Sequence, residues 1–373
     1  MKIFSVEDAR KMARKRVPKI MFDYVDGAAG DEKSHSLNIE RLEQIRLQPR
    51  VLINTETRNL SRSLFGRTWS LPFGIAPMGM CNLTWPHADR WLAEAAKKHD
   101  IPIVLSTMSS SSIEVTRQRA GDNAWFQLYV GQSIEFADEL VDRAEAQGYE
   151  VLMLTVDVPQ IGPRPREQRN GFKAPLKIGS KLFLDFALHP QWSLSTIAQG
   201  VPKLANVEAG GVKKNFARNE SRGKVDWAFL DSLRSRWKGP LVVKGVMNAE
   251  DAVRIKEAGV DAVYVSNHGG RQLDASPAAI DCLPLIRKAV GPDYTLLFDS
   301  GVRNGDAVLK ALALGADFVF LGRPYMYGIG AAGESGLHQV IDLLRSQIDI
   351  ALSQLGRPDI NDIDQSVLFK YTE

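Results

Sequence analysis

Short apolar runs alternate with amphipathic stretches between about residues 70 and 330 of the chain. The apolar runs predict strands at 73–77, 102–106, 125–129, 151–157, 241–244, 262–266, 295–299 and 318–322. Between most of them, apolar residues recur at helical spacing and predict helices at 89–98, 134–146, 249–258, 278–290 and 305–314. This repeated alternation predicts an α/β fold, a closed parallel (β/α)8 TIM barrel. A doubly wound open sheet is the alternative, but it usually has fewer strands and a glycine-rich turn after the first strand.

Helical patterns flank the alternation on both sides. Residues 5–48 have a helical pattern interrupted at Val17-Pro18, and residues 333–355 predict a long closing helix. We therefore expect one domain over the whole chain. Its expected parts are an N-terminal helical segment (1–69), the barrel (70–330), and a C-terminal helix with its tail (331–373).

The connection after the fourth predicted strand is unusually long. It runs from Val158 to Pro240, more than twice the roughly 30 residues that one barrel unit needs. We place an insertion at about 173–224, which includes an apolar patch at 182–188 and Trp192. Long excursions from a barrel tend to be lids, docking surfaces or disordered segments.

Composition narrows the function classes. The 373 residues carry a net charge of +3, which gives no reason to expect nucleic acid as a partner. The two cysteines, Cys81 and Cys282, are far apart and predict reduced thiols, while the histidines show no metal-binding spacing, so no metal is expected. No apolar run approaches the ~20 residues of a membrane span, and residues 1–8 lack a signal-like apolar core. A cytoplasmic protein is expected.

Polar side chains gather at the carboxyl ends of the predicted strands, where a barrel places its chemistry. They include Ser106, Gln127, Tyr129, Thr155, Asp157, Lys244, Ser266, His268, Asp299 and Arg323. Barrel interiors are otherwise apolar, and buried polar groups without partners are costly. Polar groups at nearly every strand end therefore predict a ligand.

The segment Ser266-Asn-His-Gly-Gly-Arg-Gln-Leu-Asp274 follows the sixth predicted strand. His268 can move a proton near neutral pH, and Arg271 can hold an anion by two parallel hydrogen bonds. Asp157 at the end of another strand could stabilise a protonated His268, and Arg164 could be a second carboxylate clamp. The alternatives are a structural histidine in a glycine turn, a turn aspartate and surface arginines.

The last two predicted strands lead into loops that are typical of phosphate binding. Asp299-Ser-Gly-Val-Arg-Asn-Gly305 and Gly322-Arg-Pro324 combine glycines and arginines with a following helix N-terminus. Lys244 lies within a buried strand and is costly unless it meets an anion, for which a flavin that becomes anionic on reduction is suitable. FMN, with one phosphate, fits these features better than NAD. Plain turn glycines with surface arginines are the alternative.

These motifs resemble the FMN-dependent L-2-hydroxy acid oxidase and dehydrogenase family, which includes glycolate oxidase, respiratory L-lactate dehydrogenase and mandelate dehydrogenase. The resemblance covers essentially the whole chain, and the segment 266–274 is its most specific motif. It implies His268 as the active-site base with Asp157 supporting it. Tyr129 and Lys244 complete the catalytic set. The implied substrate-binding residues are Tyr24, Met108, Tyr129, Arg164, His268 and Arg271.

The resemblance also implies where FMN binds. The implied residues are Pro77, Met78, Gly79, Ser106, Gln127, Thr155, Lys244, Ser266, Asp299, Ser300, Gly301, Val302, Arg303, Gly322 and Arg323. The chain departs from the family pattern beside Arg164. Members commonly have a basic residue before that arginine and an acidic residue after it, whereas this chain has Pro163 and Pro165.

The implied function is oxidation of an L-2-hydroxy acid, lactate- or mandelate-like, to the 2-oxo acid, with quinone as the electron acceptor. An oxidase that uses O2 and releases hydrogen peroxide is the main alternative. An FMN-barrel isomerase or reductase and a non-enzymatic flavin-binding module are weaker ones. The family also implies a homo-oligomer, commonly a tetramer.

The long connection suggests a peripheral contact with the inner face of the cell membrane. The residues that favour this contact are Lys177, Lys181, Phe183, Phe186, Trp192 and Lys203. A solvated or oligomer-contacting insertion is the alternative.

Overall fold

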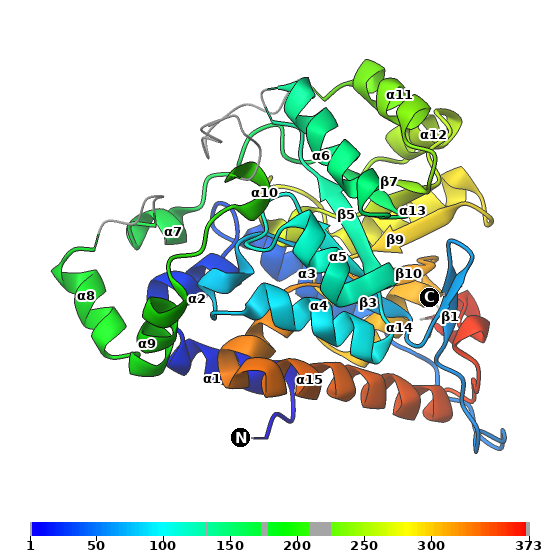
Figure 1. Ribbon diagram of the computed structural model, residues 1–373. Coiled ribbons are helices and arrows are strands. Elements are labelled where there is room, and N and C mark those ends of the chain that lie inside the picture. Colours follow the sequence, from blue (N-terminus) through cyan, green and yellow to red (C-terminus); the bar gives the residue numbers. More distant parts are fainter. Residues whose placement is uncertain (1, 132, 173–177, 209–224, 371–373) are drawn as a thin grey trace.

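Eight parallel strands close into a barrel at the centre of the protein (Figure 1). The computed structural model describes residues 2–131, 133–172, 178–208 and 225–370. The barrel strands, in chain order, are β3 (Phe73–Met78), β4 (Ile103–Ser106), β5 (Ala124–Leu128), β6 (Leu152–Thr155), β7 (Leu241–Val246), β8 (Ala262–Val265), β9 (Thr295–Phe298) and β10 (Phe318–Leu321). The barrel closes where β10 pairs with β3. The predicted (β/α)8 barrel is confirmed, with a strand in each predicted apolar run.

Helices follow the strands and form the outer layer. They are α4 (Ala88–His99), α5 (Ile113–Ala120), α6 (Ile134–Ala146), α11 (Trp227–Arg236), α12 (Ala249–Glu257), α13 (Ala279–Val290), α14 (Gly305–Ala313) and α15 (Arg323–Gln354). Short 3-10 turns are η1 (Cys81–Leu83), η2 (Gly121–Asn123), η3 (His268–Gly270), η4 (Ile360–Asp362) and η5 (Gln365–Val367). The predicted closing helix is present but begins earlier, at Arg323, and it is kinked at Ala332 and Gly333.

The strands are buried on both faces, which is why they appear in the sequence as nearly continuous apolar runs. Alternate residues such as Val104, Met153 and Val242 form a cluster inside the barrel, and their neighbours pack against the surrounding helices. This packing fixes the strand ends, from which the functional side chains project.

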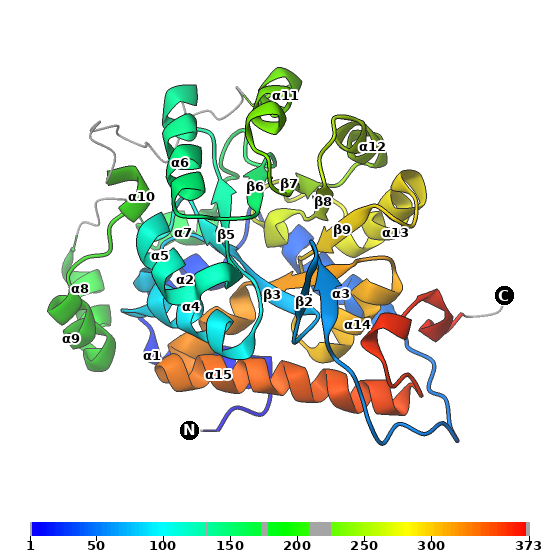
Figure 2. The ribbon, with the colours of Figure 1, turned by 45° about the vertical axis from the view of Figure 1, so that its right-hand side comes forward.

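The N-terminal segment contains α1 (Val6–Arg16), α2 (Lys19–Asp26) and α3 (Lys33–Gln44). Ser5 caps α1, with its Oγ accepting a hydrogen bond from the backbone N of Asp8 at 3.0 Å. Helix α1 runs along α15 (Figures 1 and 2), and α3 packs against η3. The barrel and its functional end are therefore supported by the N-terminal helices.

A small antiparallel hairpin of β1 (Arg62–Leu64) and β2 (Arg67–Trp69) precedes the barrel. It was not predicted, because three-residue strands with mostly polar side chains give no clear alternation. In both ribbon views the hairpin lies away from helices α8 and α9 (Figures 1 and 2).

The long connection after β6 contains α7 (Pro165–Arg169), α8 (Ser180–Ala187), α9 (Pro190–Gln199) and α10 (Ala205–Glu208). Figure 1 shows α8 and α9 standing out from the barrel. The expected insertion at about 173–224 is therefore helical in its described part, while 173–177 and 209–224 lie outside the described residues. In the described ranges, no helix combines the length and apolarity that a membrane crossing requires.

Candidate active site

His268 lies at the mouth of the barrel, directly after β8, in a left-handed backbone conformation with φ of 59°. Such a conformation is costly for a non-glycine residue and is often found at functional sites. The Nδ1 atom of His268 lies 3.0 and 3.1 Å from the two carboxylate oxygens of Asp157. The Nε2 atom lies 3.3 Å from the hydroxyl of Tyr129. The carboxylate therefore favours the proton on Nδ1 and directs Nε2 toward Tyr129.

Electrostatics keep this pair in a neutral imidazole and ionised carboxylate form. Burial lowers the pKa of His268, Lys244 and Arg164 lower it further, and Asp157 opposes them. Burial alone would raise the pKa of Asp157, but the charge and hydrogen bond of His268, with the charge of Lys244, hold it below its ordinary value. A neutral imidazole in this position can accept a proton at Nε2, and the Asp157 carboxylate beside Nδ1 would stabilise the imidazolium that forms.

Gly245 allows Asp157 to approach His268. Its φ is +102°, and a Cβ atom there would lie 2.5 Å from the Cβ and Cγ atoms of Asp157. A larger residue would therefore displace the carboxylate from the imidazole.

Two arginines lie beside this pair. Arg271 donates through Nη1 to the backbone oxygens of Tyr24, at 3.0 Å, and Gly27, at 2.7 Å. Its Nη2 lies 3.3 Å from Oε1 of Glu167, and Nη1 of Arg164 lies 3.4 Å from the same oxygen. The structure thus brings both predicted carboxylate-binding arginines together around one buried carboxylate.

The aromatic side chain of Tyr24 belongs to the same group of residues. The guanidinium of Arg271 lies 5.5 Å from the centre of the Tyr24 ring, and Phe172 stacks on this ring at 4.9 Å. Burial raises the pKa of Tyr24 against the opposing charges of Arg271 and Arg164. Its hydroxyl stays protonated and donates to the backbone oxygen of Gly79 at 3.3 Å.

Lys244 is buried within β7, where the sequence predicted an anionic partner. Its Nζ donates to Oγ of Ser266 at 2.8 Å and lies 3.5 Å from a carboxylate oxygen of Asp299. The Ser266 hydroxyl in turn donates to Asp299 at 2.5 Å. Asp299 therefore supplies a protein anion for Lys244 and fixes its ammonium group at the barrel mouth.

Among the residues expected to bind FMN, three buried polar atoms have no hydrogen-bond partner in the part of the chain that the structure describes. They are Nε2 of Gln127, Oγ1 of Thr155 and Nη2 of Arg303. The Ser106 hydroxyl donates to Oε1 of Gln127 at 3.0 Å and so fixes the amide with Nε2 directed elsewhere. Each unsatisfied buried group costs about 1–3 kcal/mol, which a polar ligand such as FMN would offset. The residues present therefore fit the cofactor that the sequence predicts.

The expected phosphate loops adjoin this region. Helix α14 begins after Arg303, and α15 begins at Arg323. The guanidinium of Arg323 donates to the backbone oxygens of Val25, Gly269 and Gly27 at 2.8–3.0 Å, and burial lowers its pKa to about 10. Arg323 thus ties α2 to the His268 loop as well as lying at the expected phosphate site.

The remaining expected residues lie around the same mouth. Pro77 and Met78 end β3, and Gly79 follows them, with Met108 beside it: a Cβ atom at Gly79 would lie 2.9 Å from Cβ of Met108. Gly322 lies beside Met78: a Cβ atom at Gly322 would lie 3.2 Å from the sulfur atom of Met78. In the loop after β9, Ser300 accepts from the backbone N of Gly269 at 3.1 Å, and Gly301 and Val302 continue the loop.

Two residues of the site were missed in the sequence. Glu167 contacts both arginines, and its spacing of three residues from Arg164 on a short helix was the available signal. Asn267 is buried beneath the His268 loop, donates to Ser34 and Asn38 at 3.1 and 3.0 Å, and holds η3 against α3. Its partners are distant in sequence, so no local pattern could reveal this role.

An exposed apolar surface lies on α8, α9 and their flanks. Its members are Ile178, Phe183, Leu184, Leu188, Leu194, Ile197 and Val201. Two residues expected to dock a membrane do not belong to it. Trp192 is buried, donates through Nε1 to the backbone oxygens of Leu83 and Thr84, and packs against Phe186. That part of the prediction is wrong, because these aromatic rings anchor the helices to the barrel.

Three lysines were expected to belong to the same membrane-docking surface. Lys181 and Lys203 are exposed, while Lys177 lies outside the described residues.

Known proteins resemble this chain over nearly its whole length. The family model described as FMN-dependent dehydrogenase matches residues 13–370. The chain is 40% identical to (S)-mandelate dehydrogenase of Pseudomonas putida over 371 residues, covering 98% of this chain and 94% of that protein. It is 37% identical to L-lactate dehydrogenase of Caulobacter vibrioides, covering 99% and 98%.

Solved structures show the same likeness. A crystal structure described as the monotopic membrane protein (S)-mandelate dehydrogenase is 40% identical, covers 100% of both chains and has a TM-score of 0.95. A mandelate oxidase structure is 33% identical, covers 99% of this chain and 98% of that one, and has a TM-score of 0.85.

Proposed function

This chain belongs to the FMN-dependent dehydrogenase family, and we propose that it oxidises an L-2-hydroxy acid of the mandelate or lactate type to the 2-oxo acid. The chain is an oxidoreductase with FMN as its cofactor. One observation carries the choice of substrate: a His268–Asp157 pair lies beside two arginines at the barrel mouth. An isomerase or reductase acting on phosphorylated substrates has no need of such a base joined to a carboxylate clamp.

The protein side of the reaction follows from these positions. Arg271 and Arg164 bind the substrate carboxylate, and the hydroxyls of Tyr24 and Tyr129 position the carboxylate and hydroxyl region. His268 accepts one proton at Nε2, and Asp157 stabilises the resulting imidazolium.

FMN, when bound, supplies the two-electron acceptor for the substrate. Gln127, Thr155 and Arg303 would hold it through the polar atoms that lack partners among the described residues. Lys244 provides a fixed positive charge where negative charge develops.

The test of this function is anaerobic mixing of the flavin-loaded protein with a panel of L-2-hydroxy acids. Bleaching of the flavin absorbance by mandelate, lactate or a longer acid is the expected result, and the relative rates would rank the side chains. If no hydroxy acid bleaches the flavin while FMN stays bound, the carboxylate-clamp assignment fails.

We further propose a quinone as the final electron acceptor, with the protein docked peripherally on the inner face of the membrane through α8 and α9. The exposed apolar surface defined above supports docking, as does the similarity to a monotopic membrane protein. Reoxidation by a quinone analogue faster than by air is expected. The likeness to mandelate oxidase keeps O2 as the second candidate, and faster reoxidation by air with release of hydrogen peroxide would select it.

Docking has its own test, sedimentation with anionic lipid vesicles. Phe183 and Leu188 are exposed, so serine at both positions should weaken sedimentation without unfolding the barrel. Leu285→Ser, at an exposed leucine on α13, is the matched control and should sediment like the parent protein. Equal sedimentation of both variants would contradict docking through α8.

A further inference from the structure

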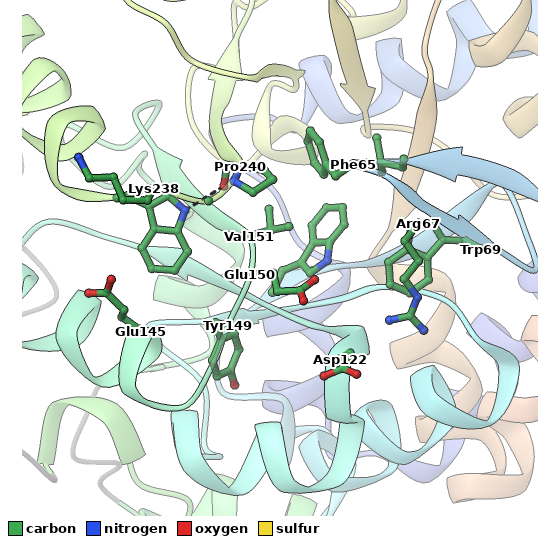
Figure 3. Close-up of a pocket in the computed structure, with 14 residues that line it drawn as sticks. Phe65, Arg67, Trp69, Asp122, Glu145, Tyr149, Glu150, Val151, Lys238 and Pro240 are labelled. Atoms are coloured by element: carbon green, nitrogen blue, oxygen red, sulfur yellow. Dashed lines mark hydrogen bonds between the residues drawn. The ribbon is translucent and has the colours of Figure 1, made fainter.

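A cavity opens near the amino-terminal ends of the barrel strands, away from the candidate active site (Figure 3). Its volume is about 330 Å³, at the lower end of the range of small-molecule pockets. Five aromatic side chains line it: Phe65, Trp69, Trp125, Tyr149 and Trp237. This end of a barrel usually serves stability rather than chemistry, and the proposed oxidation uses none of these residues.

The aromatic walls are held in place by contacts outside the cavity. Nε1 of Trp237 donates to the backbone oxygen of Pro240 at 3.1 Å. The hydroxyl of Tyr149 donates to the backbone oxygen of Ile113 at 2.8 Å. The Trp125 ring lies 5.6 Å from the ring of Phe65. Rings that are fixed before a ligand arrives lose little conformational entropy on binding.

Two of the charged groups around the cavity are already neutralised. The guanidinium of Arg67 lies 4.0 Å from the centre of the Trp69 ring and donates to Asp100 at 2.7 Å. Asp122 accepts from Arg117 at 2.5 Å. Neither residue therefore contributes a strong net charge to a ligand.

The other charged groups leave the cavity negative. In the part of the chain that the structure describes, neither Glu145 nor Glu150 forms an ion pair, and both line the cavity. The ammonium of Lys238 donates to the backbone oxygen of Ser235, and Figure 3 shows it pointing away from the labelled aromatic side chains. The carboxylate of Glu150 lies among the aromatic side chains in the same view.

We propose that this cavity binds a small organic cation with an alkylated ammonium group. Aromatic faces attract such cations through their negative quadrupole, and a nearby carboxylate adds a direct charge. A cavity of this size accepts a head group of the size of choline. Because the site lies away from His268, the cation binds without competing with the hydroxy acid.

Isothermal titration of the FMN-loaded protein with choline tests this inference. Saturable binding of choline is expected, with weaker binding of 3,3-dimethylbutan-1-ol, which has the same shape but no charge. The double variant with Glu145→Gln and Glu150→Gln should weaken choline binding about tenfold, because it removes the two negative charges that attract the cation. Both residues are exposed, so the variant should fold normally.

Glu257→Gln is the matched control, because this glutamate is exposed at the end of α12 and does not line the cavity. It should bind choline like the parent protein. Equal binding of choline and the neutral alcohol, unchanged binding in the double variant, or no saturable binding would each overturn the proposal. A changed oligomer mass in the double variant would also overturn it, because the pocket would then receive a side chain from a second copy.

Discussion

The charge of Asp157 should control both the rate and the pH dependence of the proposed reaction. Asp157→Asn keeps the size of the side chain and an oxygen that can accept the hydrogen bond from Nδ1 of His268, so it removes mainly the charge. The two carboxylate oxygens lie 3.0 and 3.1 Å from Nδ1, where a unit charge pair is worth about 5 kcal/mol at an effective dielectric of about 20.

Part of that interaction is offset by burial, and the asparagine retains a neutral hydrogen bond. A net loss of about 3 kcal/mol in the stability of the imidazolium is therefore expected. This corresponds to a lower pKa of His268 and to about a hundredfold loss in the rate of flavin reduction.

The Asp157→Asn substitution should also shift the pH dependence of flavin reduction. A base works when deprotonated, so the rate should fall as pH falls through the pKa of His268. Burial has already lowered this pKa below its ordinary value, which places the acid limb of the parent enzyme below about pH 6.5. The negative charge of Asp157 raises the pKa of His268. Removing this charge should therefore move the acid limb to still lower pH.

Anaerobic stopped-flow measurement of flavin reduction across pH tests this prediction, with the flavin absorbance of the purified variant as the control for FMN binding. An unchanged rate with an unmoved acid limb would refute the reasoning, as would a limb shifted to higher pH. Loss of FMN would instead show that Asp157 is needed for the cofactor site.

Three shorter predictions follow from the same structure. His268→Gln should retain FMN but reduce flavin reduction by hydroxy acids to background; appreciable turnover would exclude His268 as the base. Arg271→Lys should raise KM by about tenfold or more, because lysine cannot reproduce a two-pronged carboxylate contact, and steady-state kinetics with an unchanged KM would contradict this. Asp26→Asn should lower the free energy of unfolding by about 3 kcal/mol at pH 7, because Asp26 is buried and accepts from Arg10 and Arg166. Burial alone would raise the pKa of Asp26, but these partners hold it well below its ordinary value, so its contribution is present above about pH 4 and lost at lower pH. Urea unfolding at pH 7 and pH 3 should therefore show a smaller difference between parent and variant at pH 3.

The barrel was predictable from sequence because its strands are buried on both faces. Strands such as β6 and β10 appear as uninterrupted apolar runs, and the polar residues directly after them mark the functional end. The β1–β2 hairpin was not predictable, because its strands are only three residues long. The roles of Phe186 and Trp192 also depended on tertiary contacts: an apolar residue in an insertion can face solvent or anchor a helix, and periodicity alone does not decide between them.

The sequence allowed us to name the residues of the site but not to predict how they contact one another. His268 and Asp157 could be named from the strand ends, but their approach depends on Gly245, whose open backbone conformation leaves room for the carboxylate. Glu167 escaped notice because its two arginine partners lie at different distances along the chain. The contact of Glu167 with Arg164 is local, three residues along the chain, whereas its contact with Arg271 is fixed by the closure of the barrel.

The prolines beside Arg164, which depart from the family pattern, explain how the arginines are held. Pro165 occupies the first turn of α7, where its fixed φ favours helix formation, and it makes Arg164 the residue that precedes the helix. Glu167 then lies one turn further on, 3.3–3.4 Å from both arginines. These contacts are long compared with the 2.7–2.9 Å of strong charged hydrogen bonds, whereas Arg271 is held at 2.7 Å by a backbone oxygen of Gly27. The backbone oxygen of Gly27 therefore fixes the direction of Arg271 more strongly than the Glu167 carboxylate does.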